Sequence, residues 1–196
     1  MSYKSTAMQI AFVLLAAAAT LCHANDRPKF LVEGRCPIVD IPTGFDTSRF
    51  SGNWYRIGGL RNAEEKSVNC TVYSYQLTGS GFTVISNGVL GDFSPVSQTG
   101  SLTQKTPGLA QFTTTIRDKF DAEMVVVSTD YTSYACVFTC YNFRESHKAQ
   151  FAWILSRTTS LPKETIAQCQ VALRKVGVPI AQLRGTYQGS SCQHSG

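Results

Sequence analysis

The sequence has few of the residues on which histidine-based catalytic and metal sites depend. It contains three histidines among 196 residues, and only 16% of its residues are charged. Outside the N-terminal segment the histidines are His147, in an expected turn, and His194, in the C-terminal tail. No catalytic nucleophile is evidently paired with either of them. We therefore expect a protein that is not an enzyme.

Clusters of like charge, internal repeats and low-complexity tracts are also missing. The formal net charge is +5 at pH 7, and the lysines and arginines that produce it are scattered along the chain. Scattered charge is typical of a solvated surface, so we expect no nucleic-acid partner. The hydrophobic content, 43%, is ordinary for a globular chain. We expect a single domain over residues 25–196.

Long apolar runs are absent except at the N-terminus. Lys4 precedes an apolar run over residues 8–21, and Cys22-His23-Ala24 offers small residues for cleavage. This pattern predicts a signal peptide, residues 1–24, removed after Ala24. The run is too short for a membrane anchor, and no other stretch approaches the length of a transmembrane helix. We expect a secreted, extracellular protein with no transmembrane segment.

Cysteine is the residue with the most informative distribution. An even number of cysteines remains after removal of the signal peptide, and a secreted protein meets an oxidising environment, so three disulfides are expected. The count leaves their pairing open. A zinc site on Cys136 and Cys140 lacks a second close pair of ligands, so we expect no metal. The six are Cys36, Cys70, Cys136, Cys140, Cys169 and Cys192.

Short strand-like runs fill most of the mature chain and are separated by turn signals such as Thr78-Gly79-Ser80-Gly81 and Thr106-Pro107-Gly108. Eight runs at nearly regular spacing predict an all-β antiparallel meander that closes into a sandwich or a barrel. The runs are residues 54–60, 71–77, 82–87, 95–102, 110–116, 123–128, 134–142 and 149–156.

One helix is expected after the last strand. Ser160 offers an N-cap, Pro162 suits the first turn, and Gly177 marks the C-terminal end. An apolar stripe at helical spacing predicts that this helix covers the outside of the sheet. Residues 183–187 could add another strand, and residues 25–50 are expected to be irregular. The stripe consists of Ile166, Cys169, Leu173 and Val176.

A glycine, a tryptophan and a distant arginine predict a closed barrel floor. Gly52 tolerates positive φ where the chain makes a tight crossing, and Trp54 brings a large apolar surface to the same strand. Arg157 ends the last strand and shares one face with Trp153 and Leu155. An arginine stacked on Trp54 would stabilise the floor by about 0.5–2 kcal/mol.

Three segments of the chain resemble the signature regions of the lipocalins. They are Gly52-Asn53-Trp54, Thr129-Asp130-Tyr131 and Arg157. Residues 151–157, followed by 161–165, are similar to the apolipoprotein D branch of that family. Residues 129–140 resemble the crustacyanins, the carotenoid-binding lipocalins of crustacean shell. The resemblance covers nearly the whole mature chain.

The resemblance implies an eight-stranded antiparallel up-and-down barrel, the lipocalin calyx, with one C-terminal α-helix packed outside and one small ligand inside. It also implies the disulfides Cys36–Cys140 and Cys70–Cys192, which leaves Cys136 with Cys169. The last pair is supported by the residues themselves, because Cys136 and Cys140 share a strand face and Cys169 lies on the helix stripe.

The orientation of the cysteines predicts the inner wall. If Cys136 and Cys70 face outward, side chains at odd offsets from them face inward, provided that no bulge intervenes. Such a wall is apolar and aromatic with a few hydroxyls, as expected for a hydrophobic ligand such as a carotenoid, lipid, steroid or bilin. The expected ligand-binding residues are Tyr73, Tyr75, Val137, Thr139, Trp153 and Leu155.

Two alternative functions accompany the carrier hypothesis. The protein could act mainly through association with itself or with another lipocalin, as a crustacyanin-like subunit. An isomerase of the lipocalin type is disfavoured, because that branch uses a free cysteine inside the barrel and every mature cysteine here is expected to be paired. Asn69-Cys70-Thr71 also fits the acceptor pattern for N-glycosylation at Asn69.

Overall fold

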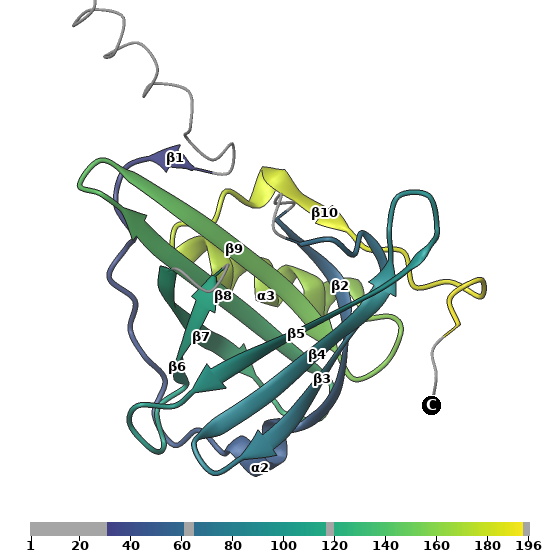
Figure 1. Ribbon diagram of the computed structural model, residues 1–196, viewed down its shortest axis with the longest axis horizontal. Coiled ribbons are helices and arrows are strands. Elements are labelled where there is room, and N and C mark those ends of the chain that lie inside the picture. Colours follow the sequence, from purple (N-terminus) through teal and green to yellow (C-terminus); the bar gives the residue numbers. More distant parts are fainter. Residues whose placement is uncertain (1–30, 61–64, 117–119, 194–196) are drawn as a thin grey trace, which may run out of the picture. The chain divides into compact units, whose positions relative to one another are not determined.

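The computed structural model describes residues 31–60, 65–116 and 120–193 (Figure 1). The predicted signal peptide lies outside these residues. Every described strand and helix lies between Val32 and Gly185. Within the described residues, no helix is long and apolar enough to cross a membrane.

Eight consecutive antiparallel strands form the wall of a closed barrel. Each strand pairs with the next, and the last pairs back onto the first, with Tyr55 opposite Ser156. Every predicted run overlaps one of them, so the eight-stranded barrel is confirmed. The strands are β2 (Gly52–Leu60), β3 (Asn69–Thr78), β4 (Gly81–Val89), β5 (Pro95–Thr103), β6 (Gln111–Ile116), β7 (Phe120–Thr129), β8 (Tyr134–Phe143) and β9 (His147–Ser156).

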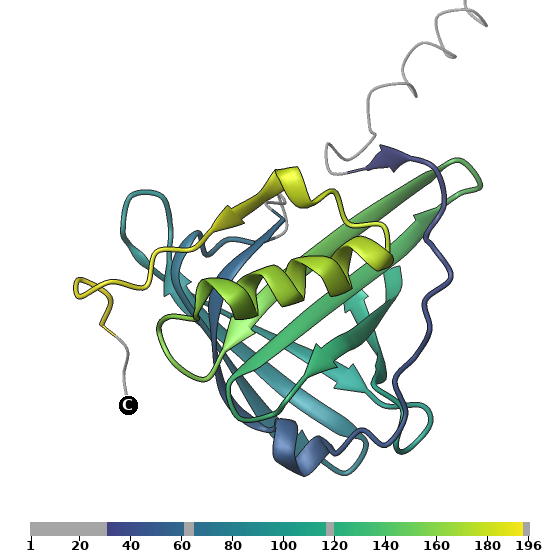
Figure 2. The same cartoon turned by 180° about the vertical axis from the view of Figure 1, so that it is seen from behind.

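Alternation along these strands produces two separate apolar layers. The inner layer fills one end of the barrel and includes Trp54, Phe82 and Val137. The outer layer includes Phe138 and Ile154, whose neighbours in sequence face inward. Helix α3 (Lys163–Lys175) covers this outer layer and lies across the outside of the barrel wall (Figure 2). The apolar stripe predicted for the helix therefore packs where expected.

The start of α3 differs from the prediction. The N-cap is Pro162 rather than Ser160, and no side chain caps the helix. Pro162 has extended ψ, and its carbonyl accepts the first helical hydrogen bond from Ile166. The proline thus ends the preceding extended segment, and the helix begins one residue later. At the other end Gly177 adopts φ +76°, and its N–H donates to the Arg174 carbonyl.

Four short elements lie outside the barrel wall. β1 (Val32–Glu33) pairs with β9, and β10 (Leu183–Gly185) pairs with β2, which adds two strands to the sheet. A 3₁₀ turn, η1 (Ile180–Gln182), precedes β10. A one-turn helix, α2 (Thr47–Phe50), is capped by Asp46 in the segment expected to be irregular. Elements of two to four residues are too short to show a hydrophobic period, which is why the sequence does not predict β1 and α2.

Three disulfides join the chain ends and the helix to the barrel. The pairs are Cys36–Cys140, Cys70–Cys192 and Cys136–Cys169, as the resemblance implied. Cys136 and Cys169 are fully buried in the outer layer between β8 and α3. Long loops closed in this way stabilise the fold by a few kcal/mol each in the chain-entropy model.

Candidate ligand-binding site

The barrel is closed at one end by the predicted contact between Trp54 and Arg157. Trp54 is fully buried, and the Arg157 guanidinium carbon lies 3.7 Å from the centroid of its ring. The guanidinium also donates to the carbonyls of Tyr131 at 3.0 Å and Asn53 at 2.9 Å. Gly52 adopts φ +94°, and a Cβ there would lie 3.3 Å from Arg157 Nη1. Conformation and space together favour glycine at this position.

Aromatic rings pack solidly above this contact and form the floor. Phe50, from α2, lies 5.1 Å from Trp54 and 5.1 Å from Tyr75, measured between ring centroids. Phe82 packs 5.5 Å from both Tyr75 and Phe112. The Trp54 indole N–H donates to the Phe50 carbonyl at 2.8 Å, so the one polar group of that ring is satisfied.

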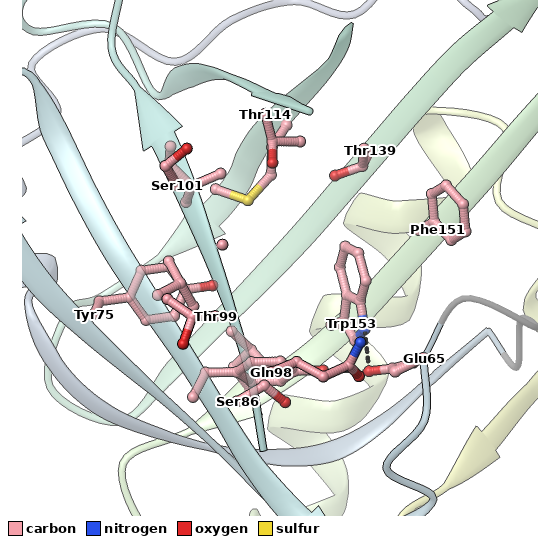
Figure 3. Close-up of a pocket in the computed structure, with 16 residues that line it drawn as sticks. Glu65, Tyr75, Ser86, Gln98, Thr99, Ser101, Thr114, Thr139, Phe151 and Trp153 are labelled. Carbon is pink, nitrogen blue, oxygen red and sulfur yellow. Dashed lines mark hydrogen bonds between the residues drawn. The ribbon is translucent and has the colours of Figure 1, made fainter. Parts of the chain in front are cut away.

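A cavity of about 270 Å³ lies on the other side of the floor. This volume is near the lower end of the range for small-molecule sites, about 300–1,000 Å³. Figure 3 shows the lining side chains, which come from seven of the eight barrel strands and the segment before β3. They are Glu65, Tyr73, Tyr75, Val84, Ser86, Gln98, Thr99, Gly100, Ser101, Leu102, Thr114, Met124, Thr139, Phe151, Trp153 and Leu155.

The cavity also reaches the barrel wall between β5 and β6. These neighbours share a single paired position, Thr103 opposite Thr113, whereas β4 and β5 pair along nine positions. Thr99, Ser101 and Thr114 line the cavity from the two strands beyond that pair. The pairing of neighbouring strands in the barrel wall is therefore sparsest at this place.

Polar groups gather at one part of the cavity around Glu65. The Trp153 indole N–H donates to Glu65 Oε1 at 3.0 Å, and the Tyr73 hydroxyl donates to the same oxygen. Glu65 Oε2 pairs with Arg56 Nη1 at 2.8 Å. Gln98 accepts a hydrogen bond from the Lys66 N–H at 3.2 Å. Figure 3 shows Glu65, Gln98 and Trp153 together at this part of the wall.

Burial raises the pKa of both cavity tyrosines. Burial first, and then the Glu65 carboxylate, raises the pKa of Tyr73 well above its ordinary value. Burial also raises the pKa of Tyr75. Both rings therefore remain neutral hydrogen-bonding groups in an otherwise apolar wall.

Five of the six expected ligand-binding residues line the cavity. They are Tyr73, Tyr75, Thr139, Trp153 and Leu155. Val137 faces inward as expected, but it lies in the packed inner layer and is not among the residues that line the cavity, so its contact with a ligand stays a prediction. Val137 pairs across β8 and β9 with Trp153, one step closer to the floor than Thr139.

The assumption that no bulge intervenes fails at Cys70. The register between β3 and β4 shifts between Asn69 and Val72, and Cys70 adopts φ +54°. Thr71 is consequently buried outside the cavity, with its hydroxyl 2.6 Å from that of Ser67. The inward orientation of Tyr73 and Tyr75 is unaffected, because regular pairing resumes at Val72.

Several lining residues were not expected from the sequence. Phe151 shares the face of Trp153 and Leu155, so strict alternation could have found it. β5 is rich in small polar residues, and its alternation does not identify Gln98 and Leu102 as inward. Glu65 precedes β3 in a segment with no strand period, so no sequence signal points to it.

Two other predictions concern glycosylation at Asn69 and metal binding. The Asn69 side-chain oxygen accepts from the Tyr187 N–H at 3.2 Å, and glycosylation at Asn69 stays a prediction. Within the described ranges, no group of three or more His, Cys, Asp or Glu residues could hold a metal ion.

Comparison with known proteins identifies relatives of this chain. The chain is 26% identical to a crustacyanin A1 subunit of Homarus gammarus over 172 residues, which covers 85% of this chain and 95% of the relative. It is 28% identical to apolipoprotein D of Rattus norvegicus over 182 residues, which covers 90% of this chain and 94% of the relative.

Solved structures show the same architecture. Lobster apocrustacyanin A1 superposes with a TM-score of 0.71 at 25% identity, covering 85% of this chain and 95% of that one. Insecticyanin from the tobacco hornworm, Manduca sexta, has a TM-score of 0.67 at 24% identity, covering 85% of this chain and 93% of that one, and shows likeness of fold alone. The model of the lipocalin / cytosolic fatty-acid binding protein family matches residues 51–189, and the chain therefore belongs to the lipocalin family.

Proposed function

We propose that this protein is a secreted carrier that binds one small hydrophobic molecule reversibly inside the barrel. The observation that carries the proposal is the cavity of about 270 Å³ above a solid aromatic floor. Its wall is mainly apolar, with Leu102, Met124, Phe151 and Leu155 among the lining residues. Removal of apolar ligand surface from water drives binding at such a site, and a few polar groups orient the ligand.

The pairing of the cysteines favours a carrier over an enzyme. The isomerase alternative requires a free thiol inside the barrel, and each described cysteine is joined in a disulfide. Cys136 and Cys140 belong to the outer layer rather than to the cavity. The matched family joins the lipocalins with cytosolic fatty-acid binding proteins, which supports ligand binding rather than catalysis for this chain.

A carotenoid is the more specific candidate ligand, because residues 129–140 resemble the crustacyanins. A colourless lipid or steroid is the broader candidate, since residues 151–165 are similar to apolipoprotein D, and a bilin is a third. The absorption spectrum and solvent extract of protein purified from its native source distinguish them. A coloured protein supports a carotenoid or bilin, and a colourless protein with an extractable lipid supports the second candidate.

Ligand titration tests the carrier function on recombinant protein. Trp153 lines the cavity, so retinoids, fatty acids, sterols and carotenoids that bind there should quench or shift tryptophan fluorescence. Trp153→Ala should weaken the binding of any such ligand. The matched control is Val171→Ala, since Val171 lies on α3 and is half exposed. If no compound changes the emission and displacement assays also detect no binding, the internal-pocket proposal is wrong.

Secretion is supported by the three disulfides and by the expected signal peptide. Expression of the full chain in a eukaryotic cell tests it: the protein should accumulate in the medium with Asn25 as its first residue. Retention of residues 1–24 on the secreted protein would contradict the predicted cleavage. Digestion with a glycosidase on the same sample tests the glycosylation of Asn69.

Association with another lipocalin is a second candidate role. The crustacyanin relatives are described as subunits, and two apolar side chains on the described surface are strongly exposed here: Ile38 and Phe93. Sedimentation of the purified protein should then give a mass above that of the monomer. A monomer at all accessible concentrations would remove self-association, and a native complex of two different chains would indicate a partner lipocalin.

A further inference from the structure

The ion pair between Arg56 and Glu65 presents its negative member to the cavity. Both side chains are largely buried, with exposed fractions of 4% for Arg56 and 11% for Glu65. Glu65 lines the cavity and also borders a small hollow beside β10, whereas Arg56 borders that hollow and does not line the cavity. The pair therefore behaves as a dipole whose negative end faces the ligand space.

The position of the Glu65 carboxylate is fixed from inside the cavity. Tyr73 and Trp153, both lining residues, donate to its Oε1, and Arg56 holds Oε2 from behind at 2.8 Å. A charge fixed in this way in a poorly solvated place acts strongly on neighbouring groups. The raised pKa of Tyr73, to which Glu65 contributes after burial, shows the same electrostatic effect on a group beside it. A second anion at this place would be disfavoured for the same reason.

The rest of the described wall offers no compensating cation. Among the described lining residues, Glu65 is the one that carries a formal charge. The other polar groups near it are neutral: Ser86, which pairs with Gln98 across β4 and β5, and Gln98 itself. Among the described residues the Gln98 amide nitrogen makes no hydrogen bond, so it is available as a donor to a ligand oxygen.

We propose that the cavity selects neutral hydrophobic ligands that end in a hydroxyl or carbonyl group, and that Glu65 is the residue that excludes carboxylates. The inference rests on the proposed carrier function and narrows it to a chemical class. A hydroxyl or carbonyl at this end meets neutral donors and acceptors, whereas a carboxylate meets the negative end of the dipole and finds no cation to pair with among the described lining residues.

Matched ligands that differ in charge alone test this selectivity. Retinol, retinoic acid and methyl retinoate share one carbon skeleton, and hexadecanol and palmitate form a second matched pair. Dissociation constants at pH 7.5 come from tryptophan quenching for the retinoids and from displacement of a neutral fluorescent probe for the second pair. We expect each acid to bind at least about tenfold more weakly than its alcohol, and methyl retinoate to bind like retinol.

Variants then assign the selectivity to Glu65. In Glu65→Gln the ratio between acid and alcohol should fall toward one. Because that variant leaves Arg56 buried without its partner, the double variant Arg56→Met with Glu65→Gln removes both charges and retains an oxygen for Tyr73 and Trp153. The double variant should lose the selectivity too. Glu123→Gln is the control, since Glu123 is an exposed carboxylate of β7 outside the cavity.

Each adverse result has a distinct meaning. If an acid binds the wild-type protein as tightly as its alcohol, the selectivity does not exist. If the acids are rejected equally by the wild type and by both Glu65 variants, another feature is responsible and the role of Glu65 is wrong. If the cavity binds none of these compounds and no other hydrophobic molecule, the carrier function itself falls, and the inference with it.

Discussion

The floor and the cavity are built from the same strands, yet one is solid and the other is open. The difference follows the size of the inward side chains along β4 and β5. Nearest the floor Phe82 pairs with Leu102, at the next inward level Val84 pairs with Gly100, and beyond it Ser86 pairs with Gln98. Large residues fill the barrel at one end, and smaller or polar ones leave space at the other.

The comparison also separates stability from function. The floor holds aromatic rings in contact with one another and an arginine bonded to several carbonyls, so we expect substitutions there to act mainly on folding. The cavity wall surrounds space that is already empty of side chains. We expect substitutions there to act mainly on ligand affinity.

The largest effect is expected for Phe50→Ala in the floor. Phe50 is fully buried between Trp54, Tyr75 and Phe82, so its loss leaves a cavity that rigid neighbours cannot fill. The free energy of unfolding should fall by about 3–5 kcal/mol in chemical denaturation. Phe93→Ala is the control, because Phe93 is 68% exposed and its removal should change little. A similar loss in both variants would mean that the floor is not a special region.

Arg157→Ala is expected to have the next largest effect. It removes the stacking on Trp54 and the hydrogen bonds to carbonyls, at a cost of about 1–3 kcal/mol in the free energy of unfolding. Arg144→Ala provides a matched control, since the exposed Arg144 guanidinium lies 5.3 Å from the Phe143 centroid. A loss below about 0.5 kcal/mol for Arg157→Ala, as for ordinary surface substitutions, would show that the floor does not depend on this contact.

Filling the cavity should produce the opposite pattern from damaging the floor. No heavy atom lies within 4 Å of a Cβ built on Gly100, and alternation with Leu102 directs that Cβ inward. Gly100→Leu should therefore leave stability unchanged or raise it by up to about 1 kcal/mol, because glycine is unfavourable in a strand. Ligand affinity should fall by at least about tenfold, roughly 1.4 kcal/mol of binding free energy.

Gly185→Leu is the control for the cavity-filling variant, since Gly185 lies on β10 outside the cavity with equally open space at its Cβ. Undiminished affinity in Gly100→Leu, measured by tryptophan quenching, would place the ligand elsewhere.

The smallest effect is expected at Asp130, in the turn that carries Tyr131 beside the floor. Partial burial opposes its ionisation, but hydrogen bonds from the Ser133 hydroxyl and from the N–H groups of Tyr134, Ser133 and Thr132 outweigh it and lower the pKa of Asp130. Asp130→Asn should cost about 1 kcal/mol at pH 7.

The pH dependence of that cost follows from the sign of the shift. A carboxyl whose pKa is lower in the folded state stabilises the fold when the pH is above the ordinary pKa of 3.8. This stabilisation is lost as the pH falls through the lowered pKa of the folded state. The difference in unfolding free energy between wild type and Asp130→Asn should shrink from pH 7 to pH 3. A constant difference over that range would mean that the charge of Asp130 contributes nothing.

Much of the barrel was predictable because its signals are local and repeated. Each strand shows alternation or turn boundaries of its own, and the inward orientation of Tyr75 and Leu155 follows from period two. The outward orientation of Cys136 follows from the same rule, and it supports the pairing with Cys169. The pairings Cys36–Cys140 and Cys70–Cys192 came from the family resemblance, since a cysteine count leaves partners undefined.

The sequence by itself thus determined the eight barrel strands, which of their side chains share a face, and that Trp54 and Arg157 belong together. Only the tertiary structure decided which inward side chains are packed against one another, as Val137 is, and which line the cavity, as Thr139 does. It also brought Glu65 beside Trp153, 88 residues away in the chain. Period and propensity act between near neighbours, whereas the free volume in a barrel and the charge facing it depend on residues that meet only after closure.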